Sequence, residues 1–96
     1  MSAINIVATI VAKPGQQDAV EKALKQVVEP SRGDDGCERY DLHRDRSDEH
    51  CFYMIERWRD VEALNSHEQQ EHFRALVDAL DDAIDRMDVV KLEQLL

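Results

Sequence analysis

Two histidines and one tryptophan lie within a single stretch of the sequence, residues 55–73 (IERWRDVEALNSHEQQEHF). Histidine side chains in general titrate near neutral pH, so the imidazole of His67 or of His72 could take a proton from an acidic phenol or a carbon acid. Trp58 and Phe73 could supply apolar walls beside them. An exposed position on a helix is the more frequent place for a histidine at such spacing, so the neighbouring elements must decide between the two roles.

A predicted β-hairpin precedes this stretch and supplies aromatic side chains. Residues 37–44 and 50–58 are expected to form its strands around the polar turn DRSDE. One face then carries Tyr40, Leu42, Phe52, Met54, Glu56 and Trp58. The other carries Cys37, Arg39, Asp41, His43, Cys51, Tyr53, Ile55 and Arg57. The first face suits an apolar pocket with Glu56 as its one orienting polar group. The alternative is an aromatic core in which Glu56 pairs with an arginine across a dimer.

The histidine spacing does not match a metal motif. His67 and His72 are at positions i and i+5, which project to different faces of one helix, whereas metal sites use i and i+4. We therefore expect no metal. The sequence contains no GxSxG, GxGxxG or P-loop motif, and its three glycines are too few for a loop that cradles phosphates.

The elements that must position these residues follow the order β-α-β-β-α-β. Residues 4–12 alternate as a strand buried on both sides, and a helix with apolar side chains from Val20 to Val28 ends in the breaker cluster EPSRGDDG (29–36). After the hairpin, His67 is expected in a turn before a last helix whose apolar stripe runs from Phe73 to Met87. Residues 88–96 then close the chain as a strand. This order predicts a ferredoxin-like α+β fold and a single domain over residues 1–96.

One face of the predicted sheet lacks a cover. Both helices would lie on the other face, which leaves Val7 and Val11 open to water. A second copy of the chain is the simplest cover, so we expect a homodimer or higher homo-oligomer, with residues 88–96 contributing to the interface.

Charge and hydropathy exclude two classes of partner. The net charge is −9, and the segment from Asp60 to Asp88 holds nine acids against Arg74 and Arg86, a net −7. Such a segment repels nucleic acid and anionic lipid surfaces. The apolar run INIVATIVA is half the length of a membrane span of about 20 residues, and no signal-peptide pattern precedes it. We expect a cytoplasmic protein.

The two cysteines are predicted to be free thiols. If DRSDE is the loop, residues that face each other across the hairpin sum to about 94, so Cys51 opposes His43 and Cys37 opposes Arg57. That arrangement puts the two thiols far beyond the disulfide limit of about 7 Å between Cα atoms.

Four segments, in this order, resemble the antibiotic biosynthesis monooxygenase family, in its branch of small quinol monooxygenases: KPGQQDAVEKAL, SRGDDGCERYDL, FYMIERWRDVEALNSH and EHFRAL. The similarity runs from residue 4 to about residue 92. The family fold is a ferredoxin-like dimeric α+β barrel, in agreement with the element order. The resemblance implies that O2 oxygenates a quinol, an anthrone or a similar small polyphenol without a cofactor. It fixes no catalytic set, because family members differ in their active-site residues.

The resemblance also selects candidate site residues. It implies His72 or His67 as the base, with substrate contacts from Trp58, Tyr40, Glu56, Phe73 and Asn5. Cys37 lies in the matching GCERY segment, where a cysteine more often packs than reacts.

The heme-degrading branch of the family uses an Asn, a Trp and a His. Here His67 stands at the Trp position and Val77 at the His position, and Asn5 falls early on its strand, so heme degradation is not expected.

Two other functions remain open. The same barrel also serves isomerases that do not use oxygen, some of them acting on phosphorylated ligands, for which Arg39 and Arg57 are the only candidate contacts on one hairpin face. A small-ligand-binding protein without chemistry is the other alternative.

Overall fold

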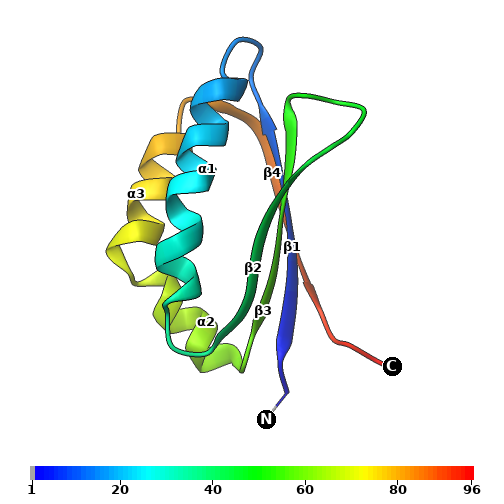
Figure 1. Ribbon diagram of the computed structural model, residues 1–96, viewed down its shortest axis with the longest axis vertical. Helices are drawn as coiled ribbons and strands as arrows, with labels where there is room; N and C mark the ends of the chain where they lie inside the picture. Colours follow the sequence, from blue (N-terminus) through cyan, green and yellow to red (C-terminus); the bar gives the residue numbers. More distant parts are fainter. Residues whose placement is uncertain (1) are drawn as a thin grey trace.

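The computed structural model describes residues 2–96 and has the expected order of elements, except that two helices stand in place of the last one. They are β1 (Ile4–Ala12), α1 (Gln17–Arg32), β2 (Cys37–Arg44), β3 (Cys51–Trp58), α2 (Val61–Glu68), α3 (Glu71–Leu80) and β4 (Ile84–Leu92). The four strands form one antiparallel sheet in the order β2-β3-β1-β4. All three helices lie on one face of this sheet (Figure 1). The prediction of an α+β, ferredoxin-like fold is confirmed.

The core forms where β1 meets the helices. Strand alternation turns Ile6, Ala8 and Ile10 towards the helices, and each of these side chains is buried. Val20 and Leu24 of α1 pack against them at helical spacing. The alternating pattern predicted for residues 4–12 therefore decides which face of the sheet is inner.

Helix α1 runs further than the breaker cluster suggests. It passes through Pro30 and ends at Arg32, where Gly33 N–H donates to the carbonyl oxygens of Glu29 and Pro30. Tertiary contacts hold this last turn. Ser31 is fully buried, and Arg32 Nε donates to the carbonyl oxygen of Tyr40 at 3.0 Å.

The second helical region differs from the prediction in two ways. His67 lies inside α2 and not in a turn, and a break at Gln69–Gln70 separates α2 from α3. The last helix ends at Leu80, so the continuous stripe predicted as far as Met87 is wrong. Residues 84–92 form β4 instead, which pairs with the free edge of β1. An apolar spacing that fits a helix also fits a strand here, and the backbone hydrogen bonds offered by β1 favour the strand.

The hairpin register is shifted by two residues from the predicted one. His43 lies opposite Tyr53 and not opposite Cys51, because His50 belongs to the turn, where its N–H donates to the Asp48 carboxylate at 2.9 Å. A shift of two residues leaves strand side chains on their predicted faces. Cys37 is the exception.

An irregularity between Cys37 and Arg39 places Cys37 opposite Trp58 and not opposite Arg57, and packs it against the core. Both Cys37 and Cys51 are free cysteines, as predicted.

The outer face of the sheet carries no helix (Figure 1). Val90 and Leu92 of β4 are 51% and 45% exposed there, beside half-buried Val7 and Val11 of β1. No helix among residues 2–96 has the length and apolar character needed to cross a membrane.

Candidate functional site

A cavity of about 260 Å³ lies between the inner face of the sheet and helices α2 and α3. Most of its wall is apolar. Side chains from every strand and helix contribute, among them Ile6, Met54, Phe73, Leu76, Met87 and Val89. The polar side chains in the wall are few: Tyr40, Glu56, His67, Glu68 and Asp81. This composition is typical of a site for a small, largely apolar ligand.

His67 is enclosed by aromatic rings at one end of the cavity. It is 1% exposed, and its ring centroid lies 4.5 Å from that of Trp58 and 5.5 Å from that of Tyr40. Phe73 meets the same imidazole edge-on at 5.1 Å. Trp58 is fully buried behind the imidazole, so it contacts His67 without lining the cavity itself.

Glu56 is a buried carboxyl group in the same wall. It is 8% exposed, and Trp58 Nε1 donates to its Oε1 at 2.9 Å. Burial raises the pKa of Glu56 to about 7, and the negative charge of Glu68 adds to this, while the hydrogen bond from Trp58 opposes it. Burial also raises the pKa of the Tyr40 phenol, on the strand beside Glu56. The cavity therefore holds a carboxyl group that can be either protonated or ionised near neutral pH.

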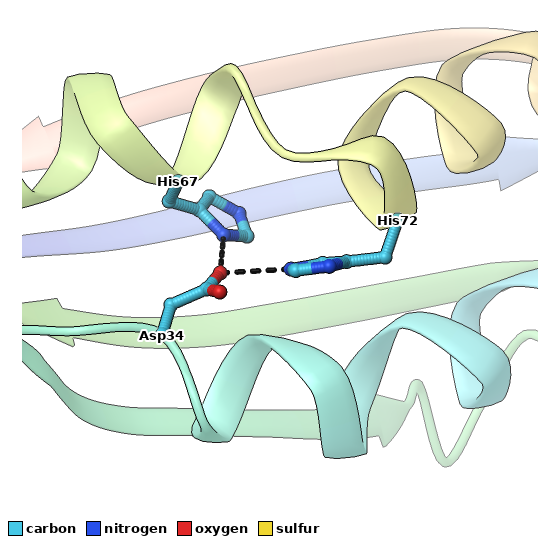
Figure 2. A group of neighbouring side chains, drawn as sticks. All are labelled: Asp34, His67 and His72. Atoms are coloured by element: carbon cyan, nitrogen blue, oxygen red, sulfur yellow. Dashed lines mark hydrogen bonds and ion pairs between the residues drawn. The ribbon is translucent and has the colours of Figure 1, made fainter.

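Asp34 joins the two histidines. Its Oδ2 lies 2.8 Å from His67 Nδ1 and 2.8 Å from His72 Nε2 (Figure 2). Asp34 stands in the loop after α1, His67 is on α2, and His72 is on the first turn of α3, so three separate segments converge on one oxygen. Because a carboxylate oxygen accepts, each ring nitrogen that faces it carries the proton.

The two histidines differ in what they face. His67 lines the large cavity, whereas His72 is partly exposed and lines a small hollow between α1 and α3. With Nδ1 donating to Asp34, His67 keeps Nε2 as an unprotonated acceptor, and no hydrogen bond to Nε2 is found among residues 2–96. Burial lowers the pKa of His67 below its usual value of 6.5, although Asp34 opposes the shift. The imidazole in the cavity is therefore neutral at physiological pH, with Nε2 able to accept a proton.

Asp34, His67 and His72 could also offer three ligand atoms to a metal ion, since these atoms lie within 4.8 Å of one another. A cation bound by all three would need both facing nitrogens without protons and would displace both hydrogen bonds. We expected no metal because His67 and His72 would lie five residues apart on one helix and face different ways. The structure shows this reason to be wrong, since the two histidines lie on different helices and converge. That the protein binds no metal stays a prediction.

Asp34 is the site residue that the sequence analysis missed. It belongs to the breaker cluster, where a second acid, Asp35, follows it, and nothing in the local pattern distinguishes the two. Asp34 turns inwards, whereas Asp35 is exposed and pairs with Arg59.

The remaining candidates lie on the outer face. Asn5 accepts a hydrogen bond from Arg57 there, and Arg57 also pairs with Glu38 at 2.8 Å. Arg39 pairs with Asp41 at 2.7 Å. None of these residues lines the large cavity.

The chain is similar to a known protein family and to a curated protein. The family model for the antibiotic biosynthesis monooxygenases matches residues 3–79. The chain is 31% identical over 70 residues to "Putative monooxygenase YcnE" of Bacillus subtilis. The aligned region covers 73% of this chain and 74% of that protein.

Solved structures resemble the whole chain. PA3566 of Pseudomonas aeruginosa superposes with a TM-score of 0.96 at 41% identity, over 100% of this chain and 97% of that one. Rv0793 of Mycobacterium tuberculosis gives a TM-score of 0.93 at 25% identity, over 98% of this chain and 96% of that one. This chain belongs to the antibiotic biosynthesis monooxygenase family.

Proposed function

We propose that this protein is a cofactor-independent monooxygenase that oxidises a small quinol, anthrone or related phenol with O2. Membership of the family supports the general role of a monooxygenase acting on a small molecule. The observation that carries the finer proposal is the neutral His67 imidazole, which Asp34 holds at the wall of an apolar cavity.

His67 is the proposed base. Its Nε2 removes a proton from the substrate, and the resulting anion is electron-rich enough to pass one electron to O2. The two radicals then combine at carbon. The hydrogen bond to Asp34 fixes the tautomer and stabilises the imidazolium as it forms.

The cavity favours this chemistry by its walls. Apolar side chains hold an aromatic ring and exclude water from the anion and from the reduced oxygen. At about 260 Å³, the cavity is close to the lower end of the range for ligand sites, roughly 300 Å³, and suits a small aromatic compound.

The alternatives have less support. An isomerase for phosphorylated ligands needs free cations, but Arg39 and Arg57 are paired with acids on the face opposite the cavity. A binding protein without chemistry does not require a buried imidazole that a carboxylate orients.

We also propose that the protein forms a homodimer through the outer face of the sheet. Exposed Val90 and Leu92, together with Val7 and Val11, provide an apolar surface for a second copy.

Oxygen uptake tests the function. Flavin-free, chelator-treated protein should consume O2 with at least one member of a panel of quinols, naphthoquinols and anthrones. The product should carry one oxygen atom from labelled O2. No uptake above the spontaneous rate with any member of the panel would contradict the proposal.

A further inference from the structure

We infer that Glu56 is the catalytic acid that protonates the substrate peroxide formed in the cavity. This inference rests on the proposed function and adds a second catalytic residue to it. The base accounts for the start of the reaction only. The O–O bond must still break, and a peroxide anion in an apolar cavity needs a proton donor for that step.

The position of Glu56 fits this role. Its side chain lines the cavity that His67 lines, and it is 8% exposed. Trp58 Nε1 donates to Oε1, which leaves Oε2 as the oxygen that carries the proton. Trp58 also contacts the His67 ring at 4.5 Å, so one indole fixes both the base and the carboxyl group at the same end of the cavity.

The surroundings of Glu56 allow its carboxyl group to carry a proton near neutral pH. Ile6 of β1 lies beside it on the sheet and is apolar, and Tyr40 of β2 lies opposite. The charged or titratable groups near it are Glu68 and His67 from α2 and Tyr40 and Cys37 from β2, and Asp81 lines the same cavity. Glu68 repels a negative charge on Glu56, and the Cys37 thiol and the His67 imidazole are neutral, so no cation among these groups favours the carboxylate. Burial places the pKa of Glu56 at about 7.

The reaction balances for a substrate with a CH2 carbon, such as an anthrone. His67 takes one C–H proton, the carbanion and O2 form a C–O–O⁻ bond, and Glu56 gives its proton to the outer oxygen. The Glu56 carboxylate then takes the second C–H proton, which breaks the O–O bond, forms C=O with hydroxide leaving, and restores the Glu56 acid. The imidazolium of His67 gives its proton to the hydroxide, which forms water and restores neutral His67. Carbon loses four electrons and O2 gains them, so CH2 and O2 give C=O and H2O.

The state of Glu56 can be measured without a substrate, because Trp58 is the only tryptophan and its N–H is bonded to Glu56. We expect the fluorescence of Trp58 in the wild-type protein to change with a midpoint near pH 7. Glu56→Gln should lose this transition and keep the fold, since the amide oxygen still accepts from Trp58. Glu56→Gln should keep any change in Trp58 fluorescence that comes from protonation of His67, which occurs below pH 6.5. A wild-type titration without the transition near pH 7, or one that persists in Glu56→Gln, would overturn the inference.

The kinetic test uses a substrate that gives oxygen uptake with the wild-type protein. Glu56→Gln should lower kcat at least ~10²-fold, release hydrogen peroxide, and lose the fall in rate above about pH 7. The exposed Glu62→Gln on α2 is the matched control and should behave as wild type. If Glu56→Gln keeps the wild-type rate and pH profile, the acid role is wrong while the monooxygenase function stands. If the wild-type protein takes up no oxygen, the function itself fails.

Discussion

The two faces of the sheet differ in polarity and in exposure to water. On the inner face, Glu56 and Trp58 are nearly inaccessible to water, and Glu56 has the indole of Trp58 as its hydrogen-bond partner. On the outer face, the neighbouring Arg57 pairs with Glu38 in solvent, and Val90 stands 51% exposed. Glu56 and Arg57 are adjacent on β3, yet Glu56 is a buried carboxyl group and Arg57 belongs to an ion pair that water reaches.

This difference separates chemistry from association. Burial on the inner face raises the pKa of Glu56 to about 7 and lowers the pKa of His67. At pH 7 the site can therefore hold a carboxylic acid and a neutral imidazole together, as acid–base chemistry requires. On the outer face charges are screened and aliphatic side chains lack a cover, which favours contact with another copy. Substitutions on the two faces should therefore affect different measurements.

The largest effect is expected for His67→Gln. Loss of the base should lower kcat by ~10²–10⁴-fold, with the dimer and the far-UV circular dichroism unchanged. Neutral His67 is the reactive form, so the wild-type rate should rise as pH rises through the lowered pKa of His67, below 6.5. His43→Gln, on the outer face, is the control. Equal loss in both variants would show that the effect is not specific to the cavity.

Glu56→Gln should change stability in a pH-dependent way. The pKa of Glu56 is about 7 in the folded protein and 4.5 as a free side chain, so the folded state binds the proton more tightly. Below pH 4.5 the group is protonated in both states and costs nothing. As pH rises from 4.5 to about 7, the wild-type protein loses stability relative to the variant, reaching about 3 kcal/mol in the free energy of unfolding. Urea unfolding at pH 5 and pH 8 measures this, and a difference that does not vary with pH would contradict burial of a titrating Glu56.

Asp34→Asn should affect turnover less than loss of the base. A hydrogen bond to a charged group is worth about 1.5–3 kcal/mol, which corresponds to a kcat lower by about 10- to 150-fold. Asp35→Asn, one residue away and exposed, should leave kcat unchanged. If the two variants are indistinguishable, Asp34 does not position His67.

The smallest effect on catalysis, and a direct one on association, is expected for Val90→Asp. A charge at this exposed outer position should weaken a dimer at least about tenfold, because it must be desolvated at the interface. Sedimentation at several concentrations checks this. A wild-type protein that is monomeric at micromolar concentration would remove the proposed role of the outer face.

Local pattern was enough to predict the faces but not the site. Alternation along β3 assigned Glu56 and Trp58 correctly to one face, even though the register was shifted by two residues. Nothing local distinguishes Asp34 from Asp35, and the break between α2 and α3, which turns His72 towards His67, has no proline or glycine to mark it. The contact of Asp34 with both histidines exists only because three distant segments pack together.

Imidazole rescue of His67→Ala tests the central claim most directly. Truncation leaves a space next to Trp58 and Tyr40 in which free imidazole can take the place of the missing ring. Oxygen uptake with the reacting phenol should be lost in His67→Ala and partly restored by added imidazole, in proportion to the neutral imidazole present. Uptake that survives in His67→Ala without imidazole would contradict His67 as the base.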